Sequence, residues 1–214
     1  MNPFYQQAQK LRKTDNLEAV IYKFGQLGLR QAKHFIPPFT RAGEEPVPAT
    51  DADAKKLVDA LAVRRSIKLT GDVIYPFVGE KTTPISYNQS HIDCIWALLD
   101  YIKTRNIEKN PWDFANEVIV GRDGCVYLRF IADAKTIVNV VPVENDEQLL
   151  ALKLEGDEFQ KNPDEYTTYL AVTRDKALLS KYVSMGISLP ITFCILDGSP
   201  LDDPSEIKYL TRKK

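Results

Sequence analysis

The sequence has little of the material from which catalytic and metal sites are built. It contains three cysteines and two histidines in 214 residues, and it has no Cys-x-x-Cys pair, so it offers no recognisable zinc signature. It has only ten glycines, and it lacks the glycine-rich phosphate loops and the Gly-x-Ser-x-Gly nucleophile elbow. These absences argue against an enzyme, and we expect no catalytic residue, no metal and no cofactor.

The three cysteines are too few and too scattered for a disulfide framework. Cys94, Cys125 and Cys194 each lie in an apolar run, which is typical of small buried residues. His34 is far from every cysteine in the sequence, and His91, three residues before Cys94, is expected to be a residue at the start of a helix rather than the base of an activated thiol. We therefore expect the cysteines to be reduced packing residues.

No apolar stretch approaches the roughly 20 residues that a membrane-spanning helix requires. The start of the sequence, Met1–Tyr5, lacks the charged-then-apolar pattern of a signal peptide. Hydrophobic residues make up 44% and charged residues 27% of the chain, a composition typical of globular proteins with a packed core. We expect a cytoplasmic protein with no membrane partner.

Charge of one sign is not in excess over the whole chain, whose formal net charge is −1, but its two halves differ. Residues 1–90 hold 13 Lys and Arg against 9 Asp and Glu, whereas residues 91–214 hold 15 against 20. The basic half is the better candidate for contact with phosphate. An imbalance this small also arises by chance on a solvated surface.

The apolar pattern of the basic half predicts three helices followed by a β-hairpin. The first helix should begin near Thr14–Asn16, the second should end before Pro37-Pro38, and the third should begin at Thr50 with Asp53 completing a capping box. A loop is expected over 41–49. Alternating apolar residues in Ile67–Phe77, around a Thr-Gly-Asp turn, predict the hairpin.

Three helices and a hairpin define a winged helix, which we expect over residues 1–80. In that fold the third helix usually enters the major groove and the hairpin lies along the DNA backbone. The basic side chains expected to contact double-stranded DNA are Lys55, Lys56, Arg64, Arg65 and Lys68, with Arg30 and Lys33 on the second helix as backbone contacts.

Two observations keep other interpretations open. Asp51 and Asp53 stand at the start of the third helix, where they would repel phosphate, and charged residues on a helix often form only its solvated face. Winged helices also serve as protein-interaction modules, so the fold alone does not decide the function.

Residues 90–214 predict a small α/β domain that begins with a helix. Ser90 should cap this helix with Asp93 completing the cap, and His91 should be a solvated or capping neighbour rather than a catalytic base. The expected elements that follow are strands at 117–120 and 125–131 joined by a turn at 121–124, a strand at 137–143, a helix from Asn145-Asp146, a charged loop at 155–165, a strand at 169–173, a helix near 175–182, a strand at 191–196 and an edge strand at 207–210.

The order helix, three strands, helix, strand (αβββαβ) resembles the core of the restriction-endonuclease-like nucleases. Such enzymes hold magnesium with acidic residues on adjacent strands and have a lysine nearby. Asp123 is a candidate ligand, but Ile137–Val141 has no Glu-x-Lys pair, and Asp-Gly is a favoured turn. We therefore expect an α/β fold class (α+β) in which the second domain, residues 90–214, is a degenerate nuclease-like domain without activity.

The turn at Phe24-Gly25, the hairpin at Ile67–Phe77, the apolar helix at 92–102 and the strand Tyr169–Thr173 with Arg174-Asp175 carry a family resemblance. Over nearly the whole chain the sequence resembles an uncharacterised bacterial family of mobile-element proteins, a domain of unknown function similar in layout to the replication-relaxation proteins of conjugative and integrative elements. The resemblance implies a winged helix joined to a degenerate nuclease-like domain, and it transfers no functional residue.

Three hypotheses follow. The first is a non-catalytic DNA-binding accessory or regulatory protein of a mobile genetic element. The alternative is a protein-protein interaction module in which the α/β domain is a pseudo-enzyme that docks a protein partner. A divergent metal-dependent nuclease ranks below both.

Overall fold

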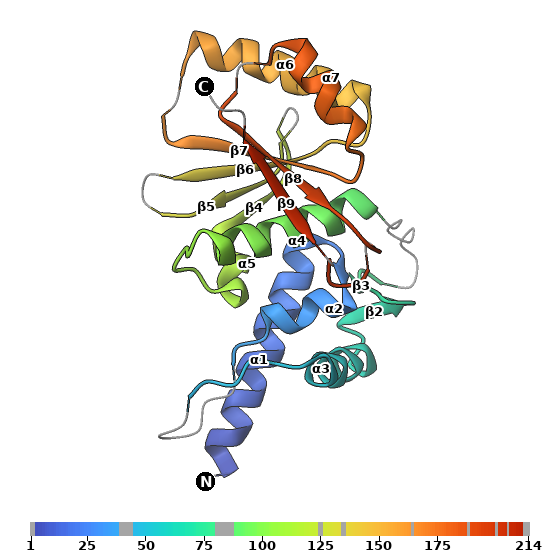
Figure 1. Ribbon diagram of the computed structural model, residues 1–214. Helices are drawn as coiled ribbons and strands as arrows, with labels where there is room; N and C mark the ends of the chain where they lie inside the picture. The colour runs from blue at the N-terminus through green and yellow to red at the C-terminus, as the bar shows by residue number, and fades with distance from the viewer. Residues whose placement is uncertain are drawn as a thin grey trace. The chain divides into compact units, whose positions relative to one another are not determined.

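A computed structural model of the protein describes residues 3–38, 45–79, 88–123, 126–133, 136–163, 165–187, 189–199, 201–204 and 206–211. The chain is a mixed α+β protein with helices and two separate β-sheets (Figure 1). Its contacts divide it into two units, and each is described by itself. Unit 1 comprises residues 1–87 and 110–116, and unit 2 comprises residues 88–109 and 117–214.

Unit 1 combines several helices with one short three-stranded sheet among its described residues. Its elements are α1 (Pro3–Phe24), β1 (Leu27–Gly28), α2 (Leu29–Ala32), the 3-10 helix η1 (Lys33–Phe35), α3 (Asp51–Val63), β2 (Ile67–Thr70), β3 (Val73–Pro76) and a second 3-10 helix η2 (Pro111–Asp113), with α5 (Phe114–Glu117) following directly. The three strands are antiparallel in the order β1-β3-β2. Residues 110–116, which the sequence boundary had assigned to the second domain, thus group with the first.

The predicted third helix and hairpin are confirmed. Thr50 caps α3 by accepting a hydrogen bond from the Asp53 backbone N–H, and the Asp53 carboxylate accepts one from the Thr50 backbone N–H. Strands β2 and β3 pair through the Gly71-Asp72 turn, where Gly71 has a φ of 59°, a backbone conformation that favours glycine.

The predicted start of the first helix is wrong, because α1 begins at Pro3 and passes through Thr14–Asn16 without a break. Thr14 lies in the middle of α1 and its side chain is buried, so it does not cap the start of a helix. The two-residue strand β1 was not predicted, since two residues are too short to show the alternation that marks a strand. The loop prediction at 41–49 falls partly on residues outside the described ranges.

The core of unit 1 contains a cluster of aromatic rings in tilted and edge-on contact. Phe35 packs against Phe24 of α1 and against Phe114, with ring centroids 5.8 Å apart in both pairs. Leu17 and Ile21 of α1 are also fully buried, as the helical spacing of the apolar residues predicted. The segment 110–116 therefore contributes a large side chain to this core.

Unit 2 is built on one six-stranded mixed sheet. Its elements are α4 (Gln89–Thr104), β4 (Val118–Asp123), β5 (Val126–Ile131), β6 (Ile137–Pro142), α6 (Asp146–Lys161), β7 (Thr167–Thr173), α7 (Ala177–Met185), β8 (Ile191–Leu196) and β9 (Ile207–Thr211). The strand order follows the chain, β4-β5-β6-β7-β8-β9. The β6-β7 and β7-β8 pairs are parallel, and the other pairs are antiparallel.

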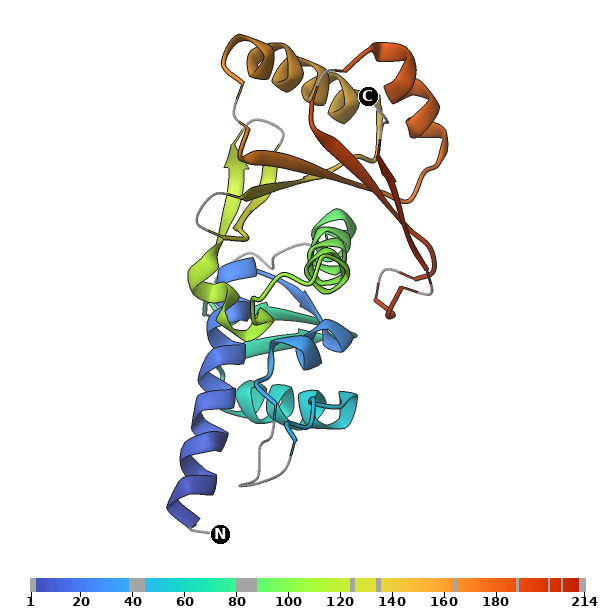
Figure 2. The same ribbon diagram turned by 60° about the vertical axis from the view of Figure 1, so that its left-hand side comes forward.

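The sheet lies between two helical layers. Helices α6 and α7 cover one face and α4 packs on the other, as both views show (Figures 1 and 2). Successive residues of a strand face opposite layers. Tyr169, Ala171 and Phe193 accordingly pack in the cluster under α6 and α7.

Three sequence predictions for unit 2 are corrected. Asn88, not Ser90, caps α4 by accepting a hydrogen bond from the His91 N–H. His91 is buried with its ring edge-on to Tyr127 at 4.8 Å, so it is not a solvated side chain. The charged loop predicted at 155–165 is wrong, because α6 continues to Lys161: its charged residues form the exposed face of an amphipathic helix.

Two further predictions fall partly outside the described residues. The turn predicted at 121–124 lies partly there, since residues 121–123 belong to β4 while Gly124 is not described. Cys94 and Cys194 are free and buried, as expected, and burial raises the pKa of both thiols, for Cys194 to about 12. Cys125 lies outside the described ranges.

In the described parts of the chain, no helix is both long enough and apolar enough to span a bilayer.

Asp93, predicted to complete a helix cap, forms a buried ion pair instead. The Arg174 guanidinium, at the end of β7, donates two hydrogen bonds of 2.7 Å to the Asp93 carboxylate. Its remaining nitrogen donates to the backbone carbonyl of Gly198, which follows β8. The exposed fraction is 7% for the Asp93 side chain and 20% for that of Arg174, so the pair holds α4 against the carboxyl ends of two strands in a largely dry environment.

We expect Arg174→Ala to lower the free energy of unfolding by about 3 kcal/mol at pH 7, because it leaves a buried carboxylate without its counter-ion. Burial, opposed by the hydrogen bonds from Arg174, raises the pKa of Asp93 above its ordinary value. Removal of Arg174 raises the pKa of Asp93 further, so the penalty of the bare carboxylate is fully present above the raised pKa of the folded variant and is lost as the pH falls towards the ordinary value of an aspartate. Denaturant titrations should therefore show a smaller loss at pH 4 than at pH 7.

The matched control is Lys176→Ala, which removes an exposed ion pair with Asp197 at 3.6 Å and should cost no more than about 0.5 kcal/mol at either pH. A loss for Arg174→Ala that is the same at both pH values would contradict the role given to the Asp93 charge.

Candidate nucleic-acid interface

Helix α3 presents one apolar face to the core of unit 1 and one polar face to solvent. Ala54, Val58 and Leu61 are buried at helical spacing. Lys55 and Lys56 lie on the exposed face, as the sequence predicted for residues that would meet a nucleic acid. Lys55 forms an exposed ion pair of 3.5 Å with Asp59, one turn further along the helix. Such a pair is weak in water and breaks at low free-energy cost when a phosphate approaches.

The acidic start of α3 is engaged by neighbouring groups. Asp51 forms an ion pair of 3.2 Å with Lys33. The Asp53 carboxylate accepts hydrogen bonds from the Thr50 hydroxyl and backbone, and these bonds lower the pKa of Asp53. Both carboxylates are therefore held at the positive end of the helix dipole, which reduces the repulsion that they would exert on a phosphate.

The end of α3 is the most unusual part of this surface. Arg65 has a φ of 57°, in the left-handed region that glycine usually occupies after a helix. The Ser66 N–H bonds back to the Leu61 carbonyl and the Arg65 N–H to that of Ala62, which closes the helix end. An L-residue other than glycine in this conformation costs about 1 kcal/mol. The strain is tolerated at a position that places a charged side chain in solvent.

The same connection leads directly into the hairpin. Arg64 and Arg65 are exposed at the end of α3, and Lys68 is exposed on β2. The tyrosine Tyr22 of α1 holds the base of the hairpin, because its hydroxyl lies 3.0 and 3.1 Å from the carbonyl oxygens of Ser66 and Phe77. Three of the predicted cations are therefore carried by one short, anchored junction.

The remaining predicted residues are distributed differently. Lys55 and Lys56 lie about 12 Å from this junction along the helix axis, at roughly 1.5 Å per residue. Arg30 is exposed on α2, whereas only 17% of the Lys33 side chain is exposed. Lys33 is committed to Asp51 and is less suited to a phosphate contact than the sequence indicated.

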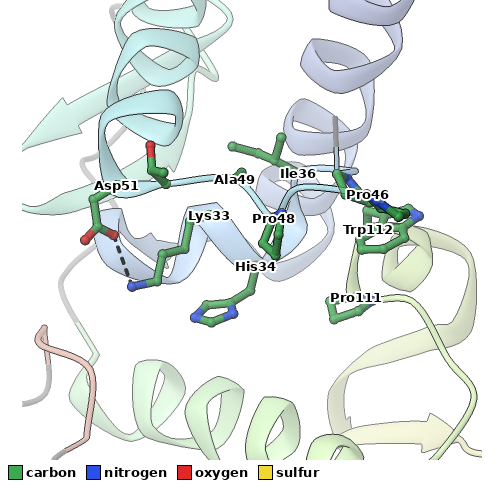
Figure 3. A pocket seen from close by; sticks show the side chains of 11 residues that line it. Lys33, His34, Ile36, Pro46, Pro48, Ala49, Asp51, Pro111 and Trp112 are labelled. Atoms are coloured by element: carbon green, nitrogen blue, oxygen red, sulfur yellow. Dashed lines mark ion pairs between the residues drawn. The ribbon is translucent and has the colours of Figure 1, made fainter. Parts of the chain in front are cut away.

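A pocket in unit 1 was not predicted from the sequence. It has a volume of about 670 Å³ and is lined by residues from η1 and the segment that follows it, from the stretch that leads into α3, and from η2 (Figure 3). Its side chains include His34 and Trp112. The two residues are 78 positions apart, and no sequence spacing relates them. The sequence signal near the pocket consists of the proline-rich segments at 37–38 and 46–48, which predict a helix end and a loop rather than the walls of a pocket.

We next consider the positions of unit 2 at which a restriction-endonuclease-like nuclease would carry its metal ligands. Asn139 of β6 is buried, and its side-chain oxygen accepts a hydrogen bond of 2.9 Å from Arg129 of β5. Asp123 lies in β4, and its side chain is outside the described part of the structure. Among the described residues no group of three or more His, Cys, Asp or Glu side chains is arranged to hold a metal ion.

A second pocket, of about 360 Å³, lies in unit 2 between the start of β5, the end of β6 and the start of α6. Glu144 and Glu147 line it together with Tyr127. Two carboxylates in a small pocket disfavour a phosphate, so the interface for a nucleic acid is better sought in unit 1.

No family model matches the chain, and neither a curated protein nor a solved structure matches it. The function must therefore be argued from the geometry and charge described above.

We expect Arg65→Gly to raise the free energy of unfolding by up to about 0.5 kcal/mol, because relief of the strain outweighs the extra freedom that glycine gains in the unfolded chain. Asn106, at the end of α4, has a φ of 51° and is the matched control. Asparagine tolerates this conformation better than arginine, so Asn106→Gly should have the smaller effect. Urea denaturation of both variants measures the difference, and destabilisation by Arg65→Gly would show that the arginine side chain itself supports the fold.

Proposed function

We propose that the protein is a non-catalytic DNA-binding accessory or regulatory protein and that unit 1 is a winged helix that contacts duplex DNA. The support is the order helix, strand, two helices and hairpin, together with the sheet order β1-β3-β2. In winged helices the third helix and the hairpin form the DNA-facing surface. The setting on a bacterial mobile genetic element is part of the proposal and rests on the resemblance of the apolar patterns alone.

The observation that carries the proposal is the strained arginine at the junction between α3 and the hairpin. Residues in strained backbone conformations cluster at functional sites, where the surrounding structure holds them. Glycine would relieve the strain at Arg65, yet the chain has an arginine there beside Arg64 and close to Lys68. In this proposal a polyanion contacts the charged side chain, which would give the strained position a function.

In the proposed complex, the exposed face of α3 approaches the major groove. Lys55 and Lys56 lie on that face, and Arg64, Arg65 and Lys68 contact phosphates at the end where the helix passes into the hairpin. Phosphate contacts release condensed counter-ions, so the affinity should fall steeply with salt.

Unit 2 is proposed to be a degenerate nuclease-like domain. Support comes from β6, where apolar valines flank Asn139 and the amide of Asn139 is committed to Arg129. The domain would then provide a rigid body to which other components attach, while DNA contact remains with unit 1.

The test of DNA binding is a gel shift of a blunt 30-base-pair duplex at several salt concentrations. The wild-type protein should bind at low salt with an affinity that falls as salt rises. The combined variant Lys55→Glu, Lys56→Glu, Arg64→Glu, Arg65→Glu should abolish the shift. A control of equal charge change on exposed residues of unit 2 is Lys103→Glu, Lys161→Glu, Lys176→Glu, Lys208→Glu.

The control variant should retain binding if the contact surface is in unit 1. Absence of binding at low salt, or equal loss in the two variants, would refute the proposal.

Arg65→Gly separates function from stability. It should weaken duplex binding and lower the slope of log affinity against log salt by about 1, the effect of losing one phosphate contact. The same variant is expected to be more stable than the wild type. Unchanged affinity and slope would remove the observation on which the proposal depends.

A protein-interaction module is the second candidate, and exposed apolar side chains on unit 2 favour it. Leu150 and Leu154 are more than half exposed one turn apart on α6, and Val183 is similarly exposed on α7, which contacts α6. Apolar residues gathered on one layer are typical of partner surfaces.

In that case the wild-type protein should retain a partner protein in quantitative affinity purification. The double variant Leu150→Glu, Leu154→Glu should lose this partner. Ser180→Glu, an exposed substitution on α7, is the control and should retain it. DNA binding by the leucine variant should be unchanged. A partner retained by the leucine variant would contradict this second candidate.

A further inference from the structure

The pocket in unit 1 has walls suited to a flat ring. Two of its segments present rigid or aromatic surfaces: the stretch before α3 with Pro46 and Pro48, and η2 with Pro111 and Trp112 (Figure 3). Residues 110–116 belong to unit 1, and η2 contacts α1 and η1. Proline rings and an indole lose little conformational freedom when a ligand binds, so such a site is already formed before binding.

The polar side of the pocket carries little net charge. Lys33 and Asp51 both line it and neutralise each other across 3.2 Å. His34, which is exposed at the rim, adds a ring with a hydrogen-bonding nitrogen. A neutral planar group that has hydrogen-bonding edges matches this lining better than a free phosphate does.

The dimensions and the chemistry narrow the choice of ligand. A volume of about 670 Å³ lies within the range of about 300–1,000 Å³ that small-molecule sites occupy. Prolines have no backbone N–H, so these walls offer few donors for an extended peptide. Peptides in the polyproline conformation bind to grooves lined by several aromatic residues, whereas Trp112 is the one tryptophan or tyrosine among the lining residues. A nucleobase stacks on a single aromatic ring.

We propose that this pocket binds an unstacked nucleobase of single-stranded DNA, with the base stacked on Trp112 and its edge within reach of His34. The inference builds on the proposed function, because it gives unit 1 a second mode of DNA contact beside the charged α3 surface. The protein would then prefer a duplex that carries a single-stranded end over a blunt duplex.

The test uses the full chain and four DNA probes labelled with a fluorophore: a blunt duplex, the same duplex with a three-nucleotide overhang, the overhang duplex with abasic sites in the overhang, and the overhang strand alone. Base stacking on an aromatic side chain should make binding to the overhang duplex about tenfold tighter than to the blunt duplex. The abasic overhang should abolish this gain, because it keeps the phosphates and removes the bases.

Trp112→Ala should abolish the gain and leave blunt-duplex affinity unchanged, while Trp112→Phe should retain most of the gain because it keeps a ring. Ala49→Leu is an independent variant that fills the pocket from its lining and keeps Trp112. Thermal melting verifies that each variant is folded. Intrinsic fluorescence adds a direct readout, since Trp96, 4% exposed in unit 2, is a buried reference and Trp112 should be quenched by unlabelled single strand.

The outcomes distinguish this inference from the proposed function. Single-strand binding that quenches Trp112, without any duplex binding, would support the pocket and refute the winged-helix contact. Duplex binding without a gain from the overhang, a gain that persists with abasic sites, or a gain that persists in folded Trp112→Ala would overturn the pocket. A change in Trp112 fluorescence with a proline-rich peptide and not with DNA would also overturn it, and would identify a peptide site instead.

Discussion

The pairing of β1 with β3 fixes the geometry on which the whole candidate interface depends. Leu27 lies opposite Ile74 and Gly28 opposite Val73, and the Leu29 N–H donates a hydrogen bond of 2.8 Å to the Asp72 carbonyl at the hairpin turn. Two residues of strand thus connect the start of α2 to the hairpin. Because α2 contacts α3, and α3 runs directly into β2, this small sheet holds the two helices and the ribbon in one rigid arrangement. A charged surface that must match a duplex requires such rigidity, since each flexible side chain or element loses entropy on binding.

Arg174 of unit 2 and the arginines at the end of α3 in unit 1 lie in opposite environments. In unit 2 the Arg174 guanidinium is consumed inside the structure by Asp93 and a backbone carbonyl, and such a buried pair contributes chiefly to a unique arrangement of α4 against the sheet. In unit 1 Arg64 and Lys68 are in solvent. A buried arginine that neutralises a carboxylate cannot contact a ligand, whereas the exposed cations at the junction of α3 and the hairpin can. Charges further from a bound phosphate than a Debye length, about 8–10 Å in physiological salt, are largely screened. The charged side chains near the phosphate therefore influence binding more than the net charge of the whole chain does.

The elements that sequence reasoning predicted are those whose signals are local. The capping residues of α3, the Gly71 turn and the apolar strand β8 need only neighbouring residues to be read, and all three are present. The sequence could not predict features that depend on distant partners. The acceptor role of Asp93 depends on Arg174, 81 positions away, and the pocket depends on η2 returning to unit 1. Among the candidate binding residues, exposure was predictable for those on α3 and β2, whereas the commitment of Lys33 was not.

Unit 1 is discontinuous in sequence, and this has a consequence for how the protein can be divided. The chain leaves unit 1 before Asn88, forms α4, and returns for residues 110–116, which deliver Phe114 to the aromatic core. A fragment that ends at residue 87 would lack this ring and expose the face of Phe35 that it covers. Division of the gene after residue 87 would therefore yield an incomplete unit 1, and any isolated version of unit 1 needs residues 110–116 supplied through an engineered connection or as a separate peptide. The chain passes between the two units three times, after residues 87, 109 and 116, and not once. Gene fusions and truncations should be placed with these three positions in mind.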